Sequence, residues 1–116
     1  MKAQELRIGN LFIEETSNKI IEVIGLEKNR IIFSGMFLNE WQLKPISLTE
    51  EWLLKFGYIQ IKGIHRTYSK TKYNDNTTIY NYRDYLHQQT GIKIEFVHQL
   101  QNLYFALTGE ELMLKQ

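Results

Sequence analysis

Residues 19–34 read KIIEVIGLEKNRIIFS, and this stretch decides the fold of the N-terminal half of the chain. β-Branched residues, which favour strands, stand on both sides of a polar break, at Ile20, Ile21, Val23, Ile24, Ile31 and Ile32. The break itself, Glu27-Lys28-Asn29, has a length and polarity suited to a hairpin turn. We therefore predict two paired antiparallel strands, from Lys19 to Leu26 and from Arg30 to Ser34.

The residues around this hairpin extend the predicted sheet in both directions. Before it, apolar residues alternate in one phase up to Ile8 and in another phase from Leu11. The phase changes across Gly9-Asn10, where a glycine allows a strand to bend or bulge. After the hairpin, a short strand from Phe37 to Leu43 would close the sheet. We expect an N-terminal antiparallel β-sheet that resembles a small barrel.

A short helix is expected after Pro45, the only proline of the chain. Ser47-Leu48-Thr49-Glu50 matches the capping box that begins many helices, so we place the first helical residue at Leu48. An apolar stripe at helical spacing consists of Leu48, Trp52, Leu53 and Phe56. Gly57 follows it and can adopt the left-handed conformation that ends a helix. The stripe predicts a buried Trp52 and an exposed Leu54.

The second half of the chain predicts another strand group and a longer helix. Tyr58 to Lys62 alternates apolar with polar residues, and so does part of Thr78 to Leu86. A half-buried strand is expected over residues 92–96, with Gly91 at its entry. Apolar residues then repeat at helical spacing from Val97 to Leu107, followed by Gly109. These segments predict a second antiparallel strand group and a C-terminal helix, in a single α+β domain over residues 1–116.

Composition narrows the classes of protein that this chain can be. It has 116 residues, of which 43% are hydrophobic, and its formal net charge is +1. The near-neutral charge gives no global reason to bind nucleic acid or a membrane. The chain has no cysteine, which excludes disulfides, thiolate zinc sites and cysteine nucleophiles. No apolar run approaches the ~20 residues of a membrane span, and the N-terminus does not resemble a signal peptide, so we expect no membrane partner.

Sequence motifs of common enzymes and metal sites are missing. The glycines form no phosphate-binding loop, and the serines lack the setting of a hydrolase nucleophile. Three histidines, His65, His87 and His98, do not stand at the spacing of metal ligands. His98 lies among apolar residues of the C-terminal helix and is expected to pack there. We therefore expect no enzymatic activity, no metal and no cofactor.

One segment concentrates both positive charge and tyrosine. From Lys62 to Lys93 there are six lysines and arginines against two aspartates, and this interval contains five of the seven tyrosines. Tyrosine and arginine anchor protein interfaces, and with lysine they also stack on bases and contact phosphates. The candidate binding residues are Arg66, Lys70, Lys72, Tyr73, Tyr80, Tyr82 and Arg83. An ordinary solvated sheet face is the simplest alternative, a protein interface the next, and direct nucleic-acid contact the third.

The strand pattern limits how these residues can combine. Alternation along a strand places Tyr80 and Tyr82 on one face, and Arg83 and Tyr85 on the other. They can therefore form one site only where an edge or a loop presents both faces.

Three blocks of the sequence resemble a known family. They are LRIGN at residues 6–10, PISLTEEWLLKFGY at residues 45–58, and VHQLQNLYFALTGEEL at residues 97–112. With these blocks, the chain is similar to small uncharacterised proteins of phages, prophages and mobile elements of Bacteroidetes. That family has no established catalytic or binding residues, so the resemblance assigns a role to no position. It implies a protein made in the cytoplasm of a bacterial host.

The resemblance favours a protein that binds and inhibits a host protein or protein–RNA machine. Counter-defence is the leading class, with anti-CRISPR-like inhibition of an RNA-guided nuclease as a specific form. The alternative is a nucleic-acid-binding accessory protein in phage replication or gene control. A third class is an assembly factor whose copies pair through their apolar helix stripes. In the first two cases, we expect the contacts to come from the basic and aromatic segment.

Overall fold

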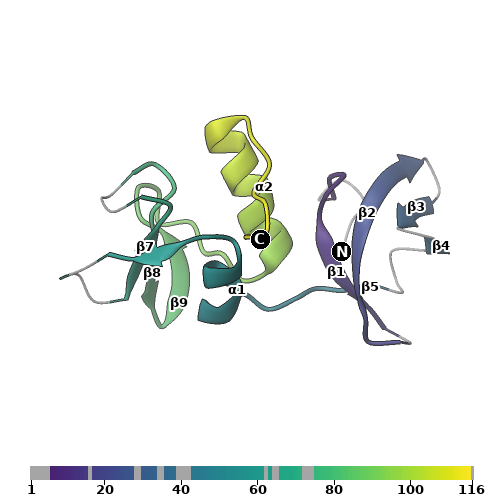
Figure 1. Cartoon of the computed structure of the whole chain (residues 1–116), viewed down its shortest axis with the longest axis horizontal. Coiled ribbons are helices and arrows are strands. Elements are labelled where there is room, and N and C mark those ends of the chain that lie inside the picture. The colour runs from purple at the N-terminus through teal and green to yellow at the C-terminus, as the bar shows by residue number, and fades with distance from the viewer. Residues whose placement is uncertain are drawn as a thin grey trace.

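The computed structural model describes residues 6–15, 17–27, 30–33, 36–38, 43–61, 63, 66–71 and 75–115. Across these residues it has an α+β fold with two antiparallel sheets and two helices. Figure 1 shows the first sheet at one end of the long axis and the second at the other, with the helices between them. The molecule measures 46 × 28 × 26 Å along its principal axes.

The first sheet contains the predicted hairpin. Its strands are β1 (Leu11–Glu14), β2 (Ile20–Glu27), β3 (Arg30–Phe33), β4 (Met36–Leu38) and β5 (Leu43–Lys44), in the order β4-β3-β2-β1-β5. The pairing of β2 with β3 confirms the prediction made from residues 19–34. The register shifts between Val23 and Gly25, which is the mark of a β-bulge.

Two predictions for this sheet were wrong. The expected strand from Phe37 to Leu43 is replaced by β4 and β5, which lie at opposite edges, and no pairing between them closes a barrel within the described residues. Residues 6–10 form a turn rather than a strand. At Gly9 the backbone has a φ of +99°, and its N–H donates to the carbonyl of Val23. The change of phase at Gly9-Asn10 is therefore real, but a turn stands where a strand was expected to bend or bulge.

The first helix is shorter than predicted. α1 (Glu50–Lys55) has Thr49 as its N-cap, because the Thr49 hydroxyl accepts a hydrogen bond from the N–H of Trp52 at 3.3 Å. Ser47 and Leu48 instead pair with the segment before the second helix, and Leu48 N donates to the Glu95 carbonyl. The capping box at Ser47 was thus a wrong prediction. Gly57, with a φ of +85°, does follow the helix as expected.

The second sheet has four strands. They are β6 (Ile59–Gln60), β7 (Thr67–Ser69), β8 (Ile79–Tyr82) and β9 (Asp84–His87), and they follow one another in that order. The sequence pattern missed β7, which has only three residues and no alternation. It also missed the tight turn at Arg83, which divides the expected strand of residues 78–86 into β8 and β9.

The C-terminal helix agrees with its prediction, whereas the strand expected before it is absent. Residues 92–96 make only isolated bridges, from Lys93 to Leu86 and from Phe96 to Ser47. α2 (Val97–Thr108) follows and ends at Gly109, which is left-handed with a φ of +74°. Val97 and Leu100 are fully buried, which confirms that the helix stripe belongs to the core.

The core has a main cluster and a smaller one. The main cluster joins both helices and the second sheet to Leu11 of β1. The smaller cluster lies within the first sheet and consists of Leu6, Phe12, Ile21 and Val23. His98 is buried, and its ring lies 4.8 Å from that of Phe12 in the smaller cluster and 5.9 Å from that of Phe96. This confirms the expected packing role of His98.

Of the residues expected in the core or at the surface of α1, one differs from its prediction. Leu54 is exposed, as expected. Trp52 is only half-buried: its ring centroid lies 5.9 Å from that of Phe56, and the Lys55 ammonium lies over the ring at 4.8 Å.

A side-chain amide joins α2 to the first sheet. Gln101 is buried, and its Oε1 accepts a hydrogen bond from Leu11 N at 2.9 Å while its Nε2 donates to Gly9 O at 3.0 Å. β5 pairs with β1 only at Ile13 and Glu14, so no strand formed by the described residues lies beside the start of β1 on this side. The Gln101 amide supplies there the donor and acceptor that a neighbouring strand would supply.

Candidate functional site

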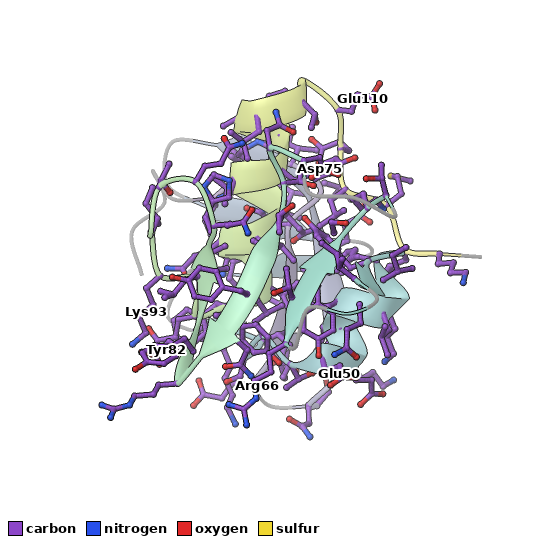
Figure 2. The ribbon with its side chains drawn as sticks, turned by 90° about the vertical axis from the view of Figure 1, so that its left-hand side faces the viewer. Glu50, Arg66, Asp75, Tyr82, Lys93 and Glu110 are labelled. Carbon is purple, nitrogen blue, oxygen red and sulfur yellow. The ribbon has the colours of Figure 1, made fainter. Side chains whose placement is uncertain are left out.

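The turn between β8 and β9 gathers part of the predicted binding set at one end of the second sheet. We call this the hairpin-end surface and define it by Arg66, Tyr82, Arg83 and Lys93. Figure 2 shows Arg66, Tyr82 and Lys93 at the same end of the sheet, while Asp75 lies at the opposite end. Tyr82 is 67% exposed, a large value for an aromatic side chain, and Arg66 and Arg83 are exposed as well.

Backbone geometry explains how Tyr82 and Arg83 come to share one end. Arg83 is the single residue between the paired residues Tyr82 and Asp84, so it lies in a turn rather than on the opposite strand face. The prediction that Arg83 and Tyr85 share one strand face was therefore wrong. Arg66 joins this end because its carbonyl accepts a hydrogen bond from Asn81 N at 2.9 Å.

Both arginines of the hairpin-end surface have a backbone conformation that arginine seldom adopts. The φ of Arg66 is +58° and that of Arg83 is +66°. In this left-handed region, an L-residue is strained by about 1–2 kcal/mol, and glycine would relieve that strain. Strained residues are concentrated at binding and catalytic sites, so their presence on one exposed surface points to a role beyond folding.

The charge of the hairpin-end surface is mixed. Lys93 lies 3.7 Å from the carboxylate of Asp84, which pairs with the amine at the edge of the surface. Glu50 lies at the same end in Figure 2. Burial raises the pKa of Tyr68 to about 12, and hydrogen bonding to the Glu50 side chain acts in the same direction. Acidic and basic groups therefore stand side by side here.

Lys70 belongs to the framework rather than to this surface. It follows β7, at the opposite end of that strand from Arg66. Its ammonium donates to the carbonyl of Phe56 at 2.5 Å and lies over the rings of Tyr58 and Tyr104. Burial lowers the pKa of Lys70. The sequence prediction that Lys70 contacts a partner together with Arg66 is therefore not supported by its position.

The remaining predicted binding residues are divided. Tyr80 is half-buried in β8, on the same strand face as Tyr82, as expected. Lys72 and Tyr73 lie outside the described residues. Of the other tyrosines in the segment, Tyr68 is buried and Tyr85 packs partly against the main core. The simplest alternative, a sheet face that covers the core, thus holds for Tyr68 and Tyr85 but not for Tyr82.

The described histidines are part of the packing. His87 is buried, with its Nδ1 2.8 Å from the Thr90 hydroxyl and its Nε2 2.6 Å from the Asn76 carbonyl. A carbonyl only accepts, so Nε2 carries the proton. Across the part of the chain that the structure describes, no three histidine or carboxylate side chains are grouped to hold a metal ion. His65 is outside the described residues.

A polar cluster that the sequence reasoning missed joins the first turn to α2. The Arg7 guanidinium donates to the Asn102 side chain at 3.0 Å, pairs with Glu111, and lies 4.0 Å over the ring of Phe105. Asn10 also donates to Asn102, at 2.8 Å. These partners are more than ninety residues apart in sequence, so no local pattern could have identified them. The cluster connects the first and third blocks of the resemblance.

The comparisons with known proteins find no match. No protein-family model, curated protein or solved structure matches this chain. Among the described residues, no helix has the length and apolar character needed to cross a bilayer. A functional assignment therefore depends on the hairpin-end surface and on the chemistry of its residues.

Proposed function

We propose that this chain is a phage-type accessory protein that acts by binding, not by catalysis, and inhibits a bacterial protein or protein–RNA complex in the host cytoplasm. The observation that carries the proposal is the pair of strained arginines beside the exposed Tyr82. Tyrosine and arginine are the residue types that contribute most to binding at protein interfaces. The sequence resemblance to phage and mobile-element proteins supports the choice of a host target.

The mixed charge of the surface favours a protein partner over bare nucleic acid. A site for a phosphate backbone gains affinity from many uncompensated cations. Here Asp84 pairs with Lys93, Glu50 lies at the same end of the sheet, and Lys70 lies away from this end. A partner protein whose surface has a few acidic groups around an apolar pocket for Tyr82 would match this charge pattern better than bare nucleic acid.

The test uses the tagged chain to capture partners from bacterial lysate, with and without nuclease treatment. The binding variant is Arg66→Glu combined with Arg83→Glu. The matched control is Lys19→Glu combined with Lys44→Glu, which changes the net charge equally at exposed positions of the first sheet. Circular dichroism and thermal melting establish that all three proteins are folded.

We expect a host protein that remains bound after nuclease treatment, is lost with the binding variant and is retained by the control. An RNA-guided nuclease is the target class to examine first, by its DNA cleavage in the presence of each protein. Equal capture by the binding variant would refute the assignment of the hairpin-end surface. A partner lost with nuclease, or salt-sensitive binding to bare nucleic acid, would favour the nucleic-acid alternative.

A further inference from the structure

An open cleft lies between the first sheet and the C-terminal segment that follows α2. Its volume is about 500 Å³, and its lining includes Ile8, Leu11, Glu22, Met113, Leu114 and Lys115. Figure 1 shows the C-terminal segment running back along α2 from the end of that helix. The segment is fixed in this position, because Leu112 is buried in the main core and Lys115 N donates to the Lys55 carbonyl at 2.6 Å.

Large apolar side chains around this cleft are exposed. Ile8 is 57% exposed, Met113 69% and Leu114 46%. The sheet continues this apolar area, because the pairs Leu11–Glu22 and Ile13–Ile20 lie on one face of β1 and β2, and Ile20 is 53% exposed. Exposed apolar side chains that gather in one place mark an interaction site more often than isolated ones do.

Two opposite charges stand on opposite walls of the cleft. Glu22 comes from β2 and Lys115 from the C-terminal segment, and neither makes an ion pair with any other residue that the structure describes. The other acidic side chain of the lining, Glu111, is paired with Arg7. The cleft therefore combines an apolar centre with one acidic and one basic side chain that make no ion pair with the other described residues.

We propose that two copies of this chain associate through the cleft as a two-fold symmetric dimer, with Glu22 of each copy against Lys115 of the other. A two-fold interface must be self-complementary, because the same surface is used by both copies. An apolar patch with an acid on one side and a base on the other meets this condition after a half-turn. A partner of one charge sign would leave either Glu22 or Lys115 opposite a like charge.

The net charge of the chain also suits self-association. At +1, long-range repulsion between two copies is small. The surface is formed by β1, β2 and the C-terminal segment, so it does not overlap the hairpin-end surface. The proposal is therefore independent of the proposed function, and each can fail without the other.

The test is sedimentation equilibrium of the full chain over a wide concentration range. We expect a monomer–dimer equilibrium for the wild-type chain. Glu22→Lys alone, and Lys115→Glu alone, each place like charges together twice in the dimer and should weaken it about tenfold or more. An equimolar mixture of the two variants should form dimers again, because each then supplies the charge that the other lacks.

The control variant is Glu95→Lys, an exposed position before α2 that should leave the dimer unchanged. A wild-type chain that stays monomeric up to millimolar concentration would overturn the proposal. So would a dimer that both reversals leave intact, or reversals that change the melting temperature but not the mass, since Glu22 and Lys115 would then pair within one chain.

Discussion

Individual side chains make much of the contact between the first sheet and α2. Gln101 bonds both a donor and an acceptor of the backbone at the start of β1. The Leu11 bond is buried and the Gly9 bond is part-buried, and a buried backbone group without a partner costs about 1–3 kcal/mol. Helical periodicity predicted Val97 and Leu100 as core residues. It gave no reason to bury Gln101, because the side chain of Gln101 is hydrogen-bonded to backbone groups that lie ninety residues or more away in the sequence.

Replacing Gln101→Leu tests this role. The substitution keeps the side chain about as large and leaves Leu11 N and Gly9 O without partners. We expect the free energy of unfolding, measured by urea denaturation, to fall by about 2–4 kcal/mol. Gln88→Leu, at an exposed position, should change it by less than about 0.5 kcal/mol. Equal effects of the two substitutions would show that the Gln101 hydrogen bonds do not stabilise the fold.

Arg83 should show a conflict between stability and binding. Arg83→Gly removes the strain of its left-handed backbone and should raise the free energy of unfolding by up to about 1 kcal/mol. Arg83→Ala retains the strain and should bring no such gain. Capture of the partner should weaken with both variants. If Arg83→Gly instead destabilises the chain in urea denaturation, the arginine side chain supports the fold and its strain needs no functional reason.

At the scale of elements, the sequence correctly predicted the helices and strands whose limits depend on local residue patterns. It did not predict those whose limits depend on pairing with distant parts of the chain. The β2–β3 hairpin and α2 have strong periodicity and clear ends, so both were predicted correctly. The start of α1 and the strand at residues 92–96 were not, because Ser47 and Leu48 pair with Glu95 and Phe96 across the molecule. In the same way, the basic segment was identified by composition, but only the fold separates Lys70 from Arg66.

The buried Tyr68 of β7, close to Glu50 of α1, should make the free energy of unfolding fall at alkaline pH. Burial, and then the bond to Glu50, raises the pKa of Tyr68 to about 12, against 10.0 for an unfolded tyrosine. The folded state therefore keeps a proton that the unfolded state loses. This contribution to the free energy of unfolding is complete below pH 10 and disappears as the pH rises through 12. Tyr85 and Tyr104, whose pKa values burial also raises, act in the same direction.

The measurement is the free energy of unfolding in urea at several pH values between 8 and 12. We expect it to fall above pH 10, and to fall less steeply in Tyr68→Phe, which has no phenol to ionise. The lowered pKa of Lys70 acts in the opposite sense, because the unfolded chain binds its proton more tightly. A free energy that rises across this range would mean that Lys70, and not the tyrosines, dominates.

At the scale of the whole molecule, Arg7 holds the C-terminal segment against the first turn. Its contacts with Asn102, Glu111 and Phe105 unite three parts of the chain. Arg7→Met keeps the aliphatic part of the side chain and removes these polar contacts. We expect the amide of Lys115, which is bonded to Lys55 O, to exchange its hydrogen about tenfold faster, equivalent to about 1.4 kcal/mol.

Lys93→Met is the comparison for that experiment. It breaks another surface ion pair, with Asp84, at the far end of the molecule. Lys115 exchange should be unaffected by it. If Arg7→Met leaves the exchange of Lys115 unchanged, the buried Leu112 alone retains the segment.

The Gln101 contact also has a consequence for the biosynthesis of the chain. Translation begins at the N-terminus, so all strands of the first sheet are made by residue 44, while the amide that completes the edge of β1 is made nearly sixty residues later. Through that interval the nascent chain carries an unpaired strand edge, the kind of surface that joins to other chains. Chaperones that hold nascent polypeptides should therefore matter more for this protein than its small size suggests, and fragments ending before α2 should aggregate.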